Sequence, residues 1–168
     1  MTFGKAYPLS SGNHAVIGQP VYLVVVLIIT ATTITIAGLS LSTIMRDGRI
    51  HEVECQIEPI LTESSLMFEY ADEGSIVHMR VEFPTSLRFI VFGSLPGNGI
   101  KEPTNHTLDE NTSNNYYFVM NDGTLRTFHS NARFSDRNTT QIVVLHPGRY
   151  NLTMELMKNE GKTYVTLY

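Results

Sequence analysis

The run from Val21 to Met45 constrains this chain more than any other feature. Its 25 residues contain no Asp, Glu, Lys, Arg, Asn, Gln or His. An α-helix rises about 1.5 Å per residue, so a run of this length can cross a hydrocarbon core of about 30 Å. The sequence therefore predicts one membrane-spanning or stem helix over residues 20–46. Pro20 suits its first turn, and Gly48 suits a helix stop.

The residues before this helix resemble a short polar leader, over residues 1–19. An ordinary secretory signal has an apolar region of about 7–15 residues and ends at a small-residue cleavage site. Here the apolar run is longer and ends at the charged sequence "MRDGR", which disfavours such a signal. Whether the leader is cleaved stays open, and a mature protein starting at Asn13 or Ala15 would indicate cleavage just before the helix.

Charged residues are confined almost entirely to the rest of the chain. All 16 Asp and Glu, and all of the 12 Lys and Arg except Lys5, fall in residues 46–168. The chain therefore divides into the leader, the helix and a water-compatible domain over residues 47–168, which is long enough for one core. The domain is net acidic and has no basic stripe, so a nucleic-acid partner is not expected.

The apolar helix also carries small residues at regular spacing. Ala31 and Thr35 lie four residues apart, as do Gly38 and Ser42. Small residues at this spacing let two helices approach closely in lipid. We therefore expect membrane lipid and, through this helix, other copies of the chain or related subunits as partners. The alternative is that the Thr and Ser hydroxyls only bond the carbonyls of their own helix.

After Arg49 the apolar pattern switches to alternate positions, which is typical of half-buried strands. Val53, Cys55 and Ile57 alternate with polar residues, so this segment is predicted to be a strand with Cys55 buried in the core. The same pattern recurs along the domain, including the aromatic residues of "RFIVF" and "NYYFVM", which we expect in the core. Nine strands are expected, in residues 51–58, 64–71, 75–83, 86–93, 115–120, 124–130, 141–145, 150–157 and 162–168.

Short turns separate these predicted strands. "NDG" at residues 121–123 is a strong hairpin signal. Parallel pairing would need long crossovers that the sequence lacks, so the sheets are expected to be antiparallel. The predicted fold class is all-β: an immunoglobulin-like antiparallel β-sandwich ectodomain preceded by one N-terminal transmembrane or stem α-helix. Residues 95–114 form a long surface loop without periodicity, of the kind that is either functional or mobile.

The domain shows no catalytic or metal-binding pattern. Its one cysteine excludes an internal disulfide, and no two histidines have the spacing of a metal pair. His78 and His129 are expected to be exposed on strands. Asp109 and Glu110 could offer oxygen ligands to calcium, but the spaced ligand set of a calcium loop is missing. We therefore predict no enzyme activity, no cofactor, no metal and no small-molecule substrate.

Two signals bear on the orientation of the helix. Arg46 and Arg49 follow it and only Lys5 precedes it, a count that favours a cytoplasmic domain. Four N-x-S/T sequons in the domain favour the opposite orientation, because such asparagines are glycosylation acceptors on exported surfaces. We give the sequons more weight and expect a single-pass protein of the cell membrane with an extracellular C-terminal domain. The candidate acceptors are Asn105, Asn111, Asn138 and Asn151.

The arrangement as a whole resembles a known family. The apolar helix "GQPVYLVVVLIIT" and the strand-rich phrases "GSIVHMRVEFPTSLRFIVFG" and "PGRYNLTMEL…GKTYVTLY" resemble those of archaeal type IV pilin-like and archaellum-associated membrane proteins. The resemblance implies a helix that sits in the membrane before assembly and forms a filament core afterwards. It implies a structural or minor component of a type IV pilus-like filament, which associates with itself or with other pilin-like subunits through the N-terminal helix.

A second interpretation keeps the anchor and gives up the filament. In it, the helix tethers a β-sandwich module that binds a cell-envelope or surface partner, chiefly through residues 95–114. A third interpretation, an enzyme or a subunit of an enzyme complex, has no support in the sequence.

Overall fold

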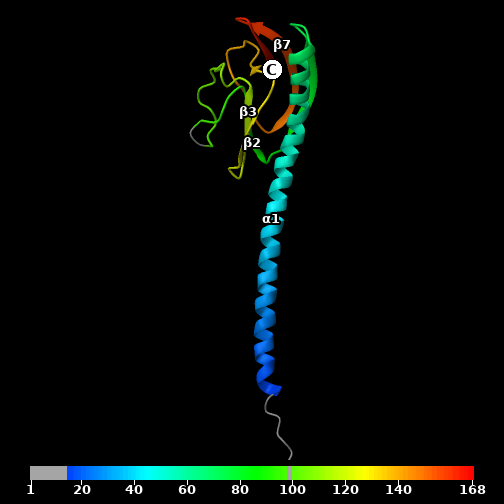
Figure 1. Ribbon diagram of the computed structural model, residues 1–168, viewed down its shortest axis with the longest axis vertical. Helices are drawn as coiled ribbons and strands as arrows, with labels where there is room; N and C mark the ends of the chain where they lie inside the picture. The colour runs from blue at the N-terminus through cyan, green and yellow to red at the C-terminus, as the bar shows by residue number, and fades with distance from the viewer. Residues whose placement is uncertain (1–14, 98–99) are drawn as a thin grey trace, which may run out of the picture. The chain divides into compact units, whose positions relative to one another are not determined.

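The computed structural model describes residues 15–97 and 100–168, with side chains from Pro20 onward. The chain divides into two compact units, residues 1–46 and residues 47–168, and each is described by itself. One helix, α1 (Ala15–Tyr70), contributes residues to both units (Figure 1). Of the predicted leader, residues 1–14 lie outside the described residues.

Helix α1 is longer at both ends than the predicted helix. It begins at Ala15, so Pro20 is not in its first turn, and it continues through Gly48 to Tyr70. The strands predicted over residues 51–58 and 64–71 are therefore wrong, and the fold is not strictly all-β. The physical reason is a stripe of six residues, spaced three or four apart, that are all buried in the domain core. This stripe consists of Ile50, Val53, Ile57, Ile60, Ser64 and Met67.

The first part of α1 contrasts with this stripe, because its described side chains from Pro20 to Met45 are all exposed. The hydroxyl groups of this part bond to carbonyls of their own helix. Thr30 donates to the carbonyl of Val26 at 2.8 Å, and Ser40 donates to that of Ile36 at 3.0 Å. The Thr and Ser hydroxyls therefore do bond carbonyls of their own helix, and whether this part of α1 also packs with other helices stays a prediction.

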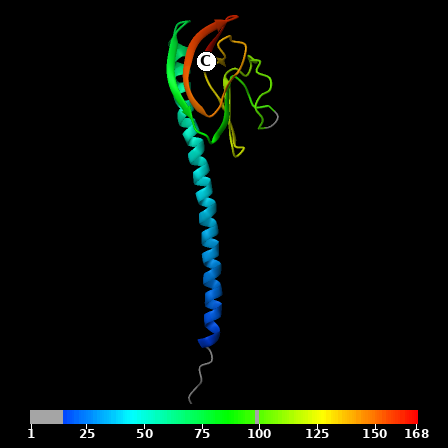
Figure 2. The ribbon, with the colours of Figure 1, turned by 180° about the vertical axis from the view of Figure 1, so that it is seen from behind.

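The remaining chain forms two four-stranded sheets (Figure 2). Sheet A has the order β1-β7-β8-β5 and sheet B the order β4-β3-β2-β6. The strands are β1 (Ile76–Phe83), β2 (Leu87–Phe92), β3 (Asn115–Met120), β4 (Leu125–His129), β5 (Phe134–Ser135), β6 (Val143–Leu145), β7 (Gly148–Asn159) and β8 (Lys162–Leu167).

The two sheets confirm the prediction of a helix followed by a two-sheet β domain. Every pair of strands is antiparallel except β5 with β8, which is parallel. The two-residue strand β5 is too short to leave a periodic signal in the sequence, so it was not predicted. The β3–β4 hairpin is confirmed, and Gly123 occupies its turn with φ of 86°, a conformation that favours glycine.

The main core lies where both sheets meet the buried stripe of α1. Side chains from β1 and β7, such as Phe83 and Met154, and from β2 and β3, such as Phe92 and Phe118, join that stripe in one cluster. Two polar contacts tie α1 to sheet A. The backbone N–H of Glu82 donates to Oε1 of Gln56 at 3.2 Å, and the Ser64 hydroxyl lies 3.7 Å from Sδ of Met154.

Strands β2 and β3 are buried on both faces, which explains their nearly continuous apolar sequences. On the face of sheet B outside the main core, Phe89, Val91 and Tyr117 form a second cluster with Ile142. Leu108, from the long loop, packs against this cluster. The predicted burial of the aromatic residues in β2 and β3 is confirmed.

Candidate functional site

A groove of about 260 Å³ lies between α1 and strands β3 and β4. Three aromatic side chains of these strands line it. The rings of Tyr116 and Phe128 stack with centroids 5.1 Å apart, and those of Phe118 and Phe128 stack at 5.9 Å. Ile57 and Leu61 of α1 line the opposite side. The groove therefore offers apolar and aromatic surface next to solvent.

The polar lining of this groove comes from one face of α1: His51, Glu54, Cys55 and Glu58. Cys55 is exposed, so its predicted place in the core is wrong. On a helix, Cys55 lies away from the buried stripe that contains Val53 and Ile57. Its Sγ lies 3.5 Å from Nε2 of His51, because residues four apart on a helix are neighbours.

Negative charge dominates the α1 side of the groove. Among the residues that the structure describes, the ion pairs of glutamates involve Glu82, Glu102 and Glu110, not Glu54 or Glu58. In that same part of the chain, no cluster of three His, Cys, Asp or Glu side chains could hold a metal ion. The groove is thus suited to an apolar group with a nearby cation rather than to a metal.

The burial and the negative charge at this site change the pKa of Tyr116. Burial, with a further contribution from the negative charge of Glu54, raises the pKa of its phenol to about 12. The phenol therefore stays neutral at physiological pH and keeps its O–H as a hydrogen-bond donor. An occupant of the groove would meet a neutral donor beside two carboxylates.

Strand β4 borders the groove and forms one edge of sheet B. The backbone N–H of Met120 donates to the carbonyl of Thr124 at 2.9 Å, and that of Ser130 donates to the carbonyl of Asn114 at 2.8 Å. Bonded positions alternate along an antiparallel strand, so residues 124, 126, 128 and 130 direct their backbone groups toward β3. Residues 125, 127 and 129 consequently direct theirs toward the open edge.

A second hollow of about 200 Å³ adjoins the groove at Leu61, which lines both. It is polar, with Ser65 of α1 on one side and the residues that follow β4 on the other. Its remaining lining residues are His129, Ser130 and Asn131. Phe128 of β4 lines the groove, and His129 at the end of β4 lines the second hollow.

The small residues predicted for helix packing are all exposed, and they lie on one face of α1. The Thr35 hydroxyl donates to the carbonyl of Ala31 at 2.8 Å, and the Ser42 hydroxyl donates to that of Leu39 at 2.8 Å. A Cβ built on Gly38 would meet no atom within 4 Å. The face is therefore open, and its role in helix packing stays a prediction.

The four candidate glycosylation asparagines are all exposed. Oδ1 of Asn105 accepts hydrogen bonds from the backbone N–H of Thr107 at 3.0 Å and from its hydroxyl at 2.8 Å. Asn151 lies on β7, where its Oδ1 accepts from Nε of Arg80 at 3.4 Å. Exposure is required for modification, and modification itself stays a prediction. Asn111 and Asn138 lie in turns between strands.

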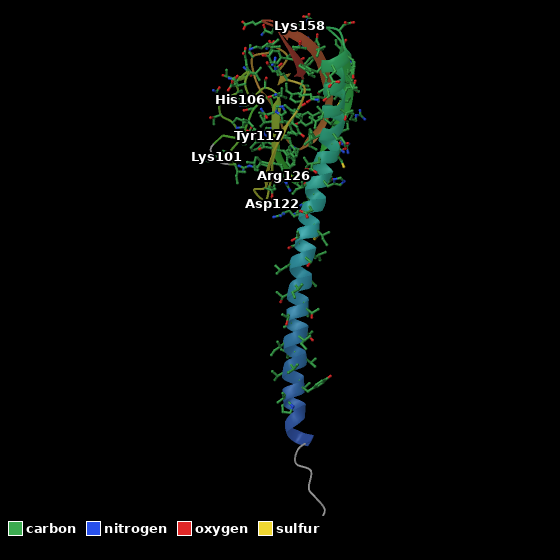
Figure 3. All side chains as sticks on the ribbon, in the orientation of Figure 1. Lys101, His106, Tyr117, Asp122, Arg126 and Lys158 are labelled. Atoms are coloured by element: carbon green, nitrogen blue, oxygen red, sulfur yellow. The ribbon has the colours of Figure 1, made fainter. Side chains whose placement is uncertain are left out.

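The long loop of residues 95–114 is tied to the rest of the domain over its described parts. The N–H of Leu108 donates to the carbonyl of Thr140 at 2.9 Å, and the N–H of Ile142 donates to that of His106 at 2.8 Å. His146 pairs with Glu102 at 3.3 Å. Figure 3 shows Lys101 and His106 on the side of sheet B that lies away from α1 and from the groove.

The predicted calcium ligands and strand histidines have ordinary structural surroundings. Oδ1 of Asp109 accepts from the N–H of Asn111 at 3.0 Å, and Glu110 pairs with Lys162. His78 and His129 are exposed, as predicted. Nδ1 of His78 lies 3.0 Å from the Thr153 hydroxyl. His129 lines the second hollow together with Leu61 of α1, whereas Asp109, Glu110 and His78 line neither the groove nor that hollow.

The comparisons with known proteins add no identification. No protein-family model matches the chain, no curated protein matches it, and no solved structure matches it. The function of the chain must therefore be argued from its own residues and geometry.

Proposed function

We propose that this chain is a pilin-like, membrane-anchored protein of the cell surface. In this proposal the charge-free part of α1, residues 21–45, spans the membrane once, and copies of the chain associate through it. The ectodomain lies outside the cell, and the protein serves as a structural or minor component of a type IV pilus-like filament.

The observation that carries this proposal is that α1 has both an exposed apolar part and a part that is buried in the domain core. By length and composition the helix is able to cross a membrane, and its apolar window has no buried residues in the structure. An exposed apolar surface of this size needs lipid or other helices to cover it. The same helix then supplies the core stripe of the ectodomain. A simple anchor could be joined to the domain by a flexible linker. Here one continuous helix enters the domain core, which suits a subunit that packs against other copies through the first part of that helix.

Self-association is tested by disulfide cross-linking with a matched pair of serines. Ser40 and Ser42 are both exposed and both bond their own helix, but they point in directions about 160° apart. In a Cys55→Ser background, Ser42→Cys on the small-residue face should form disulfide-linked dimers in membranes. Ser40→Cys should form few. Equal cross-linking at both positions would indicate random collision, and none at either would contradict self-association.

Filament assembly and orientation need separate measurements. N-terminal sequencing of the mature protein should find a start near Asn13 or Ala15, and a start at Met1 without association with filaments would contradict the pilin-like proposal. External protease should degrade the ectodomain on intact cells if it lies outside. Replacement of the four sequon asparagines by Gln should increase electrophoretic mobility only if they carry glycans.

A second candidate function is a single-pass anchored module that binds a partner of the cell envelope or surface. The observation that favours it is the groove beside β4, rather than the loop of residues 95–114, because backbone hydrogen bonds hold that loop to Thr140 and Ile142 and Leu108 packs against sheet B. Here the chain should migrate, after gentle detergent extraction, as a complex that contains a different polypeptide. A species containing only this chain would contradict that function.

A further inference from the structure

We propose that strand β4 and the groove beside it bind an extended segment of another polypeptide. The segment adds to the open edge of sheet B and places apolar side chains and one Lys or Arg against α1. This inference deepens the second candidate function and rests on it. It does not depend on self-association of the charge-free part of α1.

The backbone of β4 defines the shape of the occupant. Leu125, Thr127 and His129 direct their N–H and C=O groups away from β3 and are exposed. An antiparallel strand exchanges two hydrogen bonds with each such residue, so a partner strand gains about six. Open edges of this kind are the usual template for strand addition. A helix or a small molecule would leave most of these groups unpaired.

The groove defines the side chains of the occupant. Phe128 is paired with Tyr116 across the sheet, and both line the groove. An added strand continues the same alternation, so every second side chain of the partner points toward these rings and Leu61. Apolar residues are therefore favoured at those positions.

Charge complementarity defines the remaining group. Glu54 and Glu58 line the groove, and neither forms an ion pair within the part of the chain that the structure describes. Arg126 shares the face of Phe128 on β4 and is exposed (Figure 3). A cation of the partner is thus attracted toward Glu58 and repelled near Arg126, which sets one direction and register for the added strand.

The chain contains its own reporter for this site, because its single cysteine, Cys55, is exposed and lines the groove. The experiment uses the full chain in detergent micelles and follows the rate at which a maleimide modifies Cys55. The probe is the capped synthetic peptide Thr-Val-Thr-Lys-Thr-Val-Thr, whose Val and Lys side chains share one face when extended. We expect the peptide to slow modification of Cys55 in a saturable manner.

Two altered peptides separate strand addition from simple ionic attraction. A peptide N-methylated at its threonines keeps the charge and loses the amides that would bond to β4, so it should give no protection. A peptide with Glu in place of Lys should protect at least about tenfold more weakly, since one charge-assisted contact is replaced by repulsion. Equal protection by the N-methylated peptide would overturn the proposal.

Variants of the chain test the same point from the other side. Thr127→Pro removes an outward N–H and leaves the bonds to β3 in place, so binding should weaken about tenfold. The matched variant Thr127→Val keeps the N–H and should bind as the original chain does. Glu58→Lys should weaken binding of the Lys peptide and strengthen that of the Glu peptide. Unchanged binding by Thr127→Pro would contradict strand addition.

Two further outcomes are decisive. If Cys55 becomes protected with rising protein concentration and no peptide, a second copy occupies the groove and the assignment to another polypeptide is wrong. If a native complex with a different polypeptide survives Thr127→Pro unchanged, the second candidate function holds while this inference fails.

Discussion

The two parts of α1 are equally helical, but their apolar residues have different surroundings. From Val21 to Met45 apolar residues surround the helix on all sides and every described side chain is exposed. From Ile50 to Met67 the buried apolar residues form one stripe, and the glutamates lie on the other faces. A helix that is apolar all round needs lipid or other helices, whereas an amphipathic helix needs only one packed face. The comparison shows how one helix has a part that is long and apolar enough to cross a membrane and a part that completes a domain core.

Truncation gives the largest expected effect on this comparison. Removal of residues 1–46 should leave a folded, water-soluble domain that no longer fractionates with membranes, because the core stripe of α1 is retained. Removal of residues 1–62 deletes four of the stripe residues and should prevent folding. Membrane fractionation and circular dichroism measure the two outcomes. A domain that folds without residues 1–62 would show that α1 is dispensable for the core.

The same substitution in each part of α1 should have opposite consequences. Ile60 is fully buried, whereas Ile34 is 66% exposed. Ile60→Asp places an unpaired charge in the core, and we expect it to lower the free energy of unfolding by more than about 4 kcal/mol. Ile34→Asp should leave domain stability unchanged and disfavour membrane insertion by about 2.5–3.5 kcal/mol. Chemical denaturation and membrane fractionation distinguish them, and similar losses of domain stability would contradict the comparison.

Alkaline pH should destabilise the domain partly through Tyr116, and burial raises the pKa of the neighbouring Tyr117 in the same direction. Because the folded-state pKa of Tyr116 is about 12 and the unfolded value is 10.0, stability is complete below about pH 10. It should fall as the pH rises from 10 toward 12, since the unfolded chain releases this proton first. Tyr116→Phe should flatten that dependence. Melting temperatures at pH 9 and pH 11 give the measurement, and an equal slope in both proteins would contradict the assignment.

A smaller effect is expected where α1 contacts the edge of sheet A. Gln56→Ala removes the acceptor of the Glu82 backbone N–H and should cost about 0.5–1.5 kcal/mol of stability. Thr35→Ala, in the charge-free part, removes a hydroxyl that bonds only its own helix and should leave domain stability unchanged. Denaturant unfolding of both variants in detergent checks this. A larger loss for Thr35→Ala would mean that the two parts of α1 are not energetically separate.

The sequence predicted much of this fold because the relevant signals are local. A long charge-free run needs no partner to be recognised, and Asn121 and Gly123 mark a turn that only a few residues define. Six of the eight strands fall within predicted segments for the same reason, and β7 extends two residues beyond its segment at each end. The prediction failed at Val53, Cys55 and Ile57, where a period of two and a helical spacing overlap. The four-residue step from Val53 to Ile57 fits both, and only the longer stripe through Met67 separates them.

The candidate site could not be predicted in the same way. Its residues come from α1, β3 and β4, and the sequence distance between Glu58 and Phe128 carries no sign of their proximity. The exposure of Cys55 and its contact with His51 follow from the continuation of α1 to Tyr70, where strands were predicted instead. A window of 18 residues tested for helical spacing from Ile50 onward would have found the signal.

Composition and local pattern alone therefore determined the apolar helix, the strand-rich domain and the turn of the β3–β4 hairpin. Only the tertiary structure decided that α1 completes the core, that the long loop covers sheet B, and that β4 has an open edge beside an acidic, aromatic groove. The reason is physical: helix and turn signals arise from neighbouring residues, whereas burial, open edges and grooves arise from contacts between segments far apart in the chain.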